Sequence, residues 1–244
     1  MKIAGIERNS FVDYPGKLAA VLFTPGCNLD CFYCHNRHLL TNAADLPRLD
    51  CEVVLEWLAA RRGFLEGVVI TGGEPTLQPD LPDFVRRLRA LGYPVKLDTN
   101  GTRPHVLTRL VEGGLLDFAA MDVKAPIEAY EAVCGVPVDH SAVNTAIDLL
   151  LSGGIDYEFR TTLFPQLTEN DLVSIARRVR GAKRLVLQQY RKPTTAPEYT
   201  DARLDAPPRP ADWAVGMVDR LSGFVEQCVA RGFGVEASPR VAAP

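Results

Sequence analysis

Apolar runs of strand length alternate along the chain with segments whose apolar residues recur at helical spacing. The predicted strands lie at residues 18–24, 67–71 and 94–100, within 115–126, and at 155–164 and 183–190. The predicted helices lie at residues 51–63, 81–92, 103–114, 141–154 and 168–181. Strands that alternate with helices at this spacing predict a parallel sheet with right-handed crossovers.

Polar motifs recur where the predicted strands end. A cysteine-rich loop follows the first strand, TGGEP follows the second and DTNG follows the third. MDVK closes the fourth strand, RTT lies on the fifth and QQY ends the sixth. The carboxyl ends of parallel strands form the reactive edge both of α/β barrels and of doubly wound sheets. The pattern therefore predicts one shared site at this edge, in an open or closed barrel or in a doubly wound sheet.

We expect a single domain over residues 1–244, with its core at about residues 15–191. The proline-rich stretch at residues 192–210 is predicted to be a surface loop. The remainder, residues 211–244, is predicted to hold a helix at about 211–231 and a short strand in GFGVEA.

Composition and charge exclude several classes of partner. The chain has 244 residues, enough for one domain of barrel size, and its apolar fraction of 47% is that of a globular protein. The net charge is −3 with no basic block, so no nucleic-acid partner is indicated. No apolar run reaches membrane-spanning length and the N-terminal region lacks the apolar segment of a signal peptide, so no membrane is expected. A cytoplasmic location is expected, where cysteines stay reduced and serve metals or catalysis.

Cys27, Cys31 and Cys34 form a C-x-x-x-C-x-x-C run after the first predicted strand. Soft thiolate ligands favour zinc, Cu(I) or an iron–sulfur cluster. A closed zinc site would take His35 or His38 as its fourth ligand. The spacing differs from the paired C-x-x-C of common zinc sites, so a four-iron cluster with one open iron is favoured. The other cysteines show no ligand spacing and are interpreted as buried structural residues: Cys51, Cys134 and Cys228.

The GGEP motif follows the buried strand VVIT. Its paired glycines, Gly72 and Gly73, would let the backbone approach a ligand closely. The carboxylate of Glu74 could then receive an ammonium group, and Pro75 would stiffen the turn. Alone, this motif is only modest evidence for a binding site. It becomes specific because it follows the three-cysteine loop by one strand–helix unit.

Together, the cysteine run and GGEP resemble the two-part signature of radical S-adenosylmethionine enzymes. The resemblance implies an α/β fold built as a partial (β/α)6 TIM-like barrel of parallel strands. It implies that the three cysteines bind a [4Fe-4S] cluster whose fourth iron is chelated by S-adenosylmethionine. Tyr33 would lie near the adenine, and Gly72, Gly73 and Glu74 would hold the methionine ammonium.

Four further motifs, VDYPGK, YCHN, LDTNG and MDVKAP, resemble the activating proteins of glycyl-radical enzymes. The branch most similar is that of the anaerobic ribonucleoside-triphosphate reductase activating proteins, over about residues 3–190. This implies reductive cleavage of S-adenosylmethionine to a 5′-deoxyadenosyl radical, which generates a glycyl radical on a partner enzyme. A flavodoxin-like carrier would supply the electron. The alternative is a radical S-adenosylmethionine enzyme that acts on a small molecule.

The resemblance also implies roles for five polar residues. Asp98, Thr99 and Asp122 match a set near the amino group of S-adenosylmethionine, which in relatives can also hold a monovalent cation. Lys124 and Arg160 would bind the ligand carboxylate, whereas an ordinary salt bridge is the alternative for Asp122 and Lys124. No side chain is expected to act as acid or base, because the cofactor carries the radical.

The chain departs from the activating proteins of formate lyase at two places. They read D-G-P-G near the N-terminus, where this chain has Tyr14 in place of the first glycine. We expect this tyrosine to alter how a partner loop docks. Some relatives carry a histidine after the sixth strand, where Gln188 and Gln189 stand in this chain.

Overall fold

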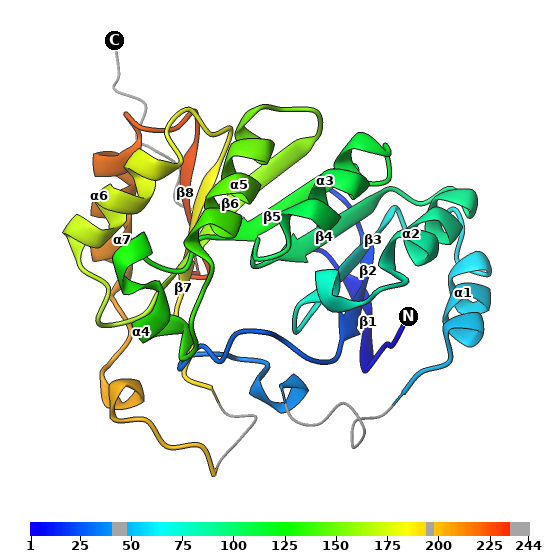
Figure 1. Ribbon diagram of the computed structural model, residues 1–244, viewed down its shortest axis with the longest axis horizontal. Coiled ribbons are helices and arrows are strands. Elements are labelled where there is room, and N and C mark those ends of the chain that lie inside the picture. Colours follow the sequence, from blue (N-terminus) through cyan, green and yellow to red (C-terminus); the bar gives the residue numbers. More distant parts are fainter. Residues whose placement is uncertain (41–47, 194–197, 235–244) are drawn as a thin grey trace. The chain divides into compact units, whose positions relative to one another are not determined.

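The computed structural model describes residues 1–40, 48–193 and 198–234, which form helices around parallel strands (Figure 1). Within this part of the chain, the strands of one eight-stranded sheet follow one another in chain order. The chain divides into two compact units. Unit 1 comprises Met1–Asn28, Asn36–Ala120 and Ser141–Asp156, and unit 2 comprises Leu29–His35, Met121–His140 and Tyr157–Pro244. The predicted α/β class with parallel strands is confirmed.

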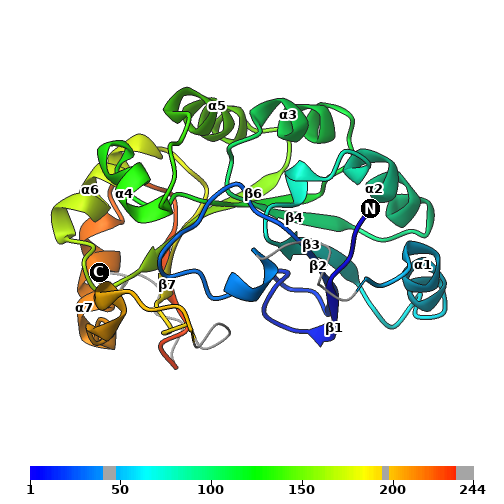
Figure 2. The ribbon, with the colours of Figure 1, turned by 60° about the horizontal axis from the view of Figure 1, so that its bottom comes forward.

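Unit 1 is built on three parallel strands with one antiparallel strand at their edge. The strands are β1 (Gly5–Ser10), β2 (Ala19–Thr24), β3 (Gly67–Gly72) and β4 (Val95–Thr99), followed by most of β5 (Phe118–Asp122). β1 pairs antiparallel with β2, whereas β2, β3 and β4 pair in parallel. The helices of this unit are α1 (Cys51–Ala59), α2 (Leu81–Ala90), α3 (Pro104–Glu112) and nearly all of α5 (His140–Leu151). Figure 2 shows α1, α2 and α3 on one side of β2 to β4.

Unit 2 continues with three more parallel strands. These are β6 (Asp156–Leu163), of which all but the first residue belongs to this unit, β7 (Leu185–Gln189) and β8 (Cys228–Arg231). Its helices are α4 (Tyr130–Cys134), α6 (Glu169–Arg178) and α7 (Ala211–Leu221). A capping box between Thr168 and Asp171 starts α6, as the sequence T-E-N-D predicts. α7 packs against β8 and α6 (Figure 1).

Most predicted elements are confirmed, but the C-terminal prediction is wrong. The helix expected to reach residue 231 ends at Leu221, and residues 228–231 instead form β8. Gly223 follows the helix end, and the apolar run after it pairs with β7 through Leu185 and Cys228. The sequence predicts a short strand in GFGVEA. Residues 232–234 of this segment do not form a strand, and residues 235–237 lie outside the described residues.

Two elements were not predicted, and part of the proline-rich stretch is helical. The unpredicted elements are β1 and α4. Within residues 192–210, Ala202–Asp205 form a short 3-10 helix, while residues 194–197 lie outside the described part of the chain. None of the helices in the described ranges is long and apolar enough to span a membrane.

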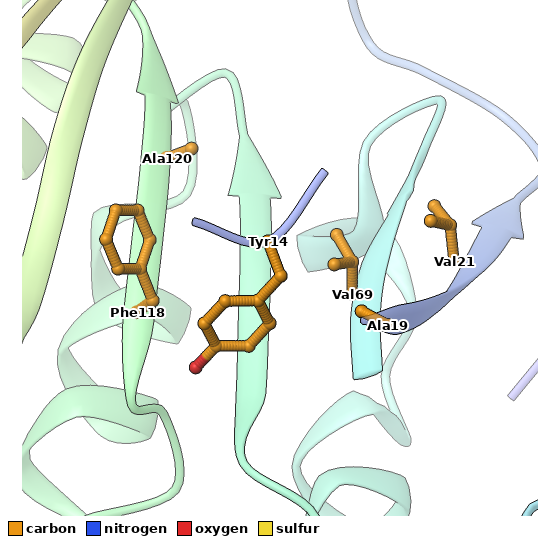
Figure 3. Close-up of a cluster of buried hydrophobic side chains, with 6 residues drawn as sticks. All are labelled: Tyr14, Ala19, Val21, Val69, Phe118 and Ala120. Carbon is orange, nitrogen blue, oxygen red and sulfur yellow. The ribbon is translucent and has the colours of Figure 1, made fainter. Parts of the chain in front are cut away.

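Tyr14 is a core residue of unit 1. Its side chain lies among residues of β2, β3 and β5, with its ring centroid 6.1 Å from that of Phe118 (Figure 3). A Cβ at Gly67 would lie 3.0 Å from the Tyr14 ring, so the ring fills the space above that glycine. The residue is 3% exposed, whereas its neighbour Phe11 is 78% exposed. The tyrosine that departs from D-G-P-G therefore completes the core, and the structure does not present it to a partner.

Replacing Tyr14 by alanine should destabilise the apo-protein by about 3–5 kcal/mol, because a large buried ring is lost and a cavity is left. Phe11→Ala is the matched control and should change stability by no more than about 0.5 kcal/mol. Thermal unfolding of both variants measures the difference. Equal melting temperatures for the two variants would contradict the core role of Tyr14.

Candidate cofactor site

The predicted site residues gather into two groups, one in each unit. Unit 1 holds Cys27, Gly72, Gly73, Glu74, Asp98 and Thr99. Unit 2 holds Cys31, Tyr33, Cys34, Asp122, Lys124 and Arg160. The cysteine loop after β2 runs from the first unit into the second, so its three thiols are shared between them.

The paired glycines let the end of β3 pack directly on the start of the cysteine loop. The backbone N–H of Gly73 donates to Thr24 O at 2.9 Å, and that of Glu74 donates to Gly26 O at 2.8 Å. A Cβ at Gly73 would lie 1.9 Å from Gly26 O. Gly72 has φ +121°, and a Cβ there would lie 2.3 Å from Thr24 N. The glycines are therefore required by backbone–backbone packing, and their approach to a ligand stays a prediction.

Glu74 is a buried brace between two strand ends. Its Oε1 accepts hydrogen bonds from Thr76 N at 3.0 Å, Thr76 Oγ1 at 2.5 Å and Thr99 Oγ1 at 2.8 Å. Its Oε2 accepts from Asn100 N at 2.7 Å. Burial raises the pKa of Glu74 above its ordinary value, although these hydrogen bonds oppose the shift. The carboxylate thus serves the chain's own donors, and its contact with a ligand ammonium stays a prediction.

Asp98 faces a buried ammonium that the sequence interpretation missed. Lys96 Nζ donates to Asp98 Oδ1 at 2.5 Å, and Thr71 Oγ1 donates to Oδ2 at 3.3 Å. The Lys96 side chain is 2% exposed, and its Nζ also lies 5.9 Å from the centroid of the Phe118 ring. Residues two apart on a strand share a face, so the sequence V-K-L-D already carried the signal. An internal cation therefore pairs with the residue expected to face the ligand amino group or a monovalent cation.

Asp122 contacts two cationic side chains within unit 2. Lys124 Nζ lies 3.3 Å from Asp122 Oδ2, and Arg160 Nε lies 2.9 Å from Oδ1. Burial lowers the pKa of Lys124, but the electrostatic effect of Asp122, and after it that of Cys31, raises the pKa by more. The pKa of Lys124 therefore lies well above its ordinary value. The salt bridge considered as the alternative interpretation is present. An ammonium and a guanidinium therefore lie on one carboxylate, and both are donor types that can bind a ligand carboxylate.

Tyr33 belongs to an aromatic cluster beside the cysteines. Its ring stacks on Phe164 with centroids 5.0 Å apart, and Phe32 packs edge-on against both rings. The guanidinium of Arg203, from the proline-rich stretch, lies 3.9 Å from the centroid of Phe32. Arg203 Nη1 also donates to Ala132 O at 2.7 Å. The proline-rich stretch therefore packs on the cysteine loop, a contact that composition alone could not indicate.

The second half of the cysteine loop is held by α4. Backbone hydrogen bonds join Asp30 N to Cys134 O at 2.8 Å and Cys34 N to Cys31 O at 2.9 Å. A side-chain hydrogen bond from Cys134 lowers the pKa of Cys31 to about 7, a shift that burial opposes. Cys134 was interpreted as a structural residue, but the structure gives it a contact with the motif. Among the described residues, no three His, Cys, Asp or Glu side chains form a ready metal site, so the ligand set stays a prediction.

The donor types present fit an iron–sulfur cluster. Thiols are the ligands that such clusters use, and polar hydrogen atoms next to the sulfurs are a typical part of their surroundings. In unit 1, Asn100 Nδ2 lies 3.8 Å from Cys27 Sγ. In unit 2, Cys134 provides the same kind of contact to Cys31. The sequence interpretation assigned no role to Asn100, although it lies within DTNG.

Polar motifs and thiols that follow parallel strands define a cofactor-dependent α/β enzyme. The model of the Radical SAM superfamily matches residues 21–179, and the chain belongs to that superfamily. Its cofactors are a [4Fe-4S] cluster and S-adenosylmethionine, and the zinc interpretation is set aside. The predicted oxidoreductase-type radical chemistry follows from this membership.

Known proteins similar to the chain include two activating enzymes. One, from Methanocaldococcus jannaschii, is 34% identical over 77% of this chain and 79% of its own length. Its name gives it as a glycyl-radical enzyme activating enzyme and marks that assignment as provisional. The pyruvate formate-lyase-activating enzyme of Clostridium pasteurianum is 26% identical over 78% of this chain and 82% of its own length. Relatives named as probable GTP 3′,8-cyclases, from Pyrococcus horikoshii, Pyrococcus abyssi and Halobacterium salinarum, align over 39–46% of this chain and 30–36% of their own length.

A solved structure supports the fold. Streptococcus suis SuiB bound to S-adenosylmethionine matches with a TM-score of 0.62 at 13% identity. The match covers 87% of this chain and 52% of SuiB, so the chain spans about half the length of that protein. At this identity, the likeness concerns the fold alone.

Gly73→Ala should destabilise the apo-protein by about 3 kcal/mol or more, because the added methyl group would overlap the backbone of Gly26. The matched control is Gly216→Ala in α7, where a Cβ would meet nothing within 4 Å. That control should gain about 0.5–1 kcal/mol from better helix propensity. Thermal unfolding and iron content after anaerobic reconstitution check both. If Gly73→Ala melts like the control and loads a full cluster, the packing account of GGEP is wrong.

Proposed function

We propose that the chain activates a glycyl-radical enzyme by generating a radical on a glycine of that partner. The observation that carries the proposal is the similarity to the M. jannaschii protein across more than three quarters of both chains. The similarity to the C. pasteurianum enzyme, over a comparable length, supports the same class of substrate. The resemblance to the anaerobic ribonucleoside-triphosphate reductase activating proteins favours that reductase as the partner, and a flavodoxin-like protein would supply the electron.

In this proposal, Cys27, Cys31 and Cys34 hold the cluster. When reduced, the cluster supplies one electron that cleaves bound S-adenosylmethionine to methionine and the radical that removes a hydrogen atom from the glycine Cα. The chain's own residues would bind and orient S-adenosylmethionine. Lys124 and Arg160, which both contact Asp122, would offer donors to the ligand carboxylate.

The remaining proposed contacts concern the other parts of the ligand. Tyr33, held by stacking on Phe164, offers an apolar face near the adenine and helps to exclude water. The backbone of Gly72, Gly73 and Glu74, with Asp98, Thr99 and Asp122, surrounds the amino group. A monovalent cation near Asp98 would compete with the ammonium of Lys96, which already lies 2.5 Å from that carboxylate.

The test is to incubate the reduced, reconstituted chain anaerobically with S-adenosylmethionine and candidate glycyl-radical enzymes, first the anaerobic ribonucleotide reductase. We expect the doublet signal of a glycyl radical in electron paramagnetic resonance and one 5′-deoxyadenosine per radical formed. A partner labelled with α-deuterated glycine should pass one deuterium to 5′-deoxyadenosine. A partner with that glycine replaced by alanine should show neither signal.

Cys34→Ala should abolish cleavage of S-adenosylmethionine, whereas Cys51→Ala, which changes a thiol outside the motif, should retain it. Cleavage without a doublet or deuterium transfer on any candidate would overturn the proposal in favour of a small-molecule substrate. Reconstituted protein that binds a cluster but never cleaves S-adenosylmethionine would contradict both the activating function and the small-molecule alternative.

A further inference from the structure

Asn100 places a hydrogen-bond donor beside the first cysteine of the motif. Its Nδ2 lies 3.8 Å from Cys27 Sγ, within the range for a hydrogen bond to sulfur. The residue is buried, and its backbone N–H is fixed by Glu74 Oε2 at 2.7 Å. Both residues belong to unit 1, so the contact is part of a single compact body.

A closed ring of hydrogen bonds determines which way the Asn100 amide points. Its Oδ1 accepts from Thr102 N at 3.0 Å and Thr102 Oγ1 at 2.7 Å, which identifies that atom as the oxygen. Its Nδ2 donates to Asn28 Oδ1 at 3.1 Å, and Asn28 Nδ2 donates to Thr102 Oγ1 at 2.8 Å. Because the amide nitrogen carries two hydrogens, one serves Asn28 and the other is left for Cys27.

Cys134 provides the equivalent contact to the second cysteine of the motif, within unit 2. The backbone N–H of Phe32 donates to Val133 O at 3.3 Å, so α4 lies against the loop beside Cys31. The Cys134 and Cys31 side chains are both buried and hydrogen-bond with each other. The backbone holds this thiol in place, since Cys134 O accepts from Asp30 N at 2.8 Å. Gly135 follows with φ +69°, and a Cβ there would lie 2.6 Å from Asp30 O. α4 therefore approaches the cysteine loop closely enough only because glycine ends it.

We infer that Asn100 and Cys134 are positioning donors that raise the reduction potential of the cluster, an inference that rests on the proposed ligand roles of Cys27 and Cys31. A cluster gains negative charge on reduction, and part of that charge resides on the cysteine sulfurs. A neutral donor stabilises this charge without changing the net charge of the site. The two donors reach different sulfurs, so their effects should add.

The experiment measures the midpoint potential of the reconstituted cluster by a redox titration followed with electron paramagnetic resonance, without partner or S-adenosylmethionine. Asn100→Ala and Cys134→Ala should each shift the potential to more negative values, and the double variant should show about the sum. Cys134→Ser keeps an O–H donor and should restore most of the potential. Cys228→Ala is the matched control, since it removes another buried thiol outside the motif and should leave the potential unchanged.

Full iron content with an unchanged potential in both alanine variants would overturn the inference. Loss of iron from these variants would also overturn it, because the residues would then hold the loop rather than tune the cluster. If no cluster forms in the unchanged chain, the ligand assignment itself fails. A normal cluster with shifted potentials, but no glycyl radical on any partner, would sustain this inference while the proposed function fails.

Discussion

The backbone contact between the end of β3 and the start of the cysteine loop is the constraint on which the site depends. Two glycines let residues 72–74 lie against residues 24–26, at distances that no side chain would permit. Two backbone hydrogen bonds then fix the start of the loop, just before Cys27. Glu74, which follows the two glycines, is buried and its carboxylate accepts four hydrogen bonds. Its acceptor atoms position Thr99 and Asn100, so one packing event orders two motifs.

Charges at the site are paired before any ligand arrives. A buried carboxylate is costly unless donors or a cation compensate it. Lys96 compensates Asp98 in unit 1, and Lys124 and Arg160 share Asp122 in unit 2. Each unit thus compensates its own carboxylate with basic side chains of the same unit.

Patterns that depend on neighbouring residues could be predicted from the sequence. The strand periodicity located β2 to β7, and the rule that motifs follow strands predicted which residues lie where those strands end. Contacts that depend on tertiary packing could not be predicted. The residues after Gly223 were predicted to continue the helix, but residues 228–231 pair with β7 and form a strand. Arg203 reaches Phe32 across 171 positions of the chain, and no local pattern indicates that pair. Cys134 resembled an ordinary buried cysteine until its contact with Cys31 was seen.

The central claim is that three thiolates leave one iron of the cluster for S-adenosylmethionine. Mössbauer spectroscopy of the chain reconstituted with 57Fe and titrated with S-adenosylmethionine tests it most directly. The account predicts that one iron in four changes its isomer shift on addition of the ligand, while the other three keep theirs. Four irons that do not respond to S-adenosylmethionine, or a protein that retains zinc in place of iron, would contradict it.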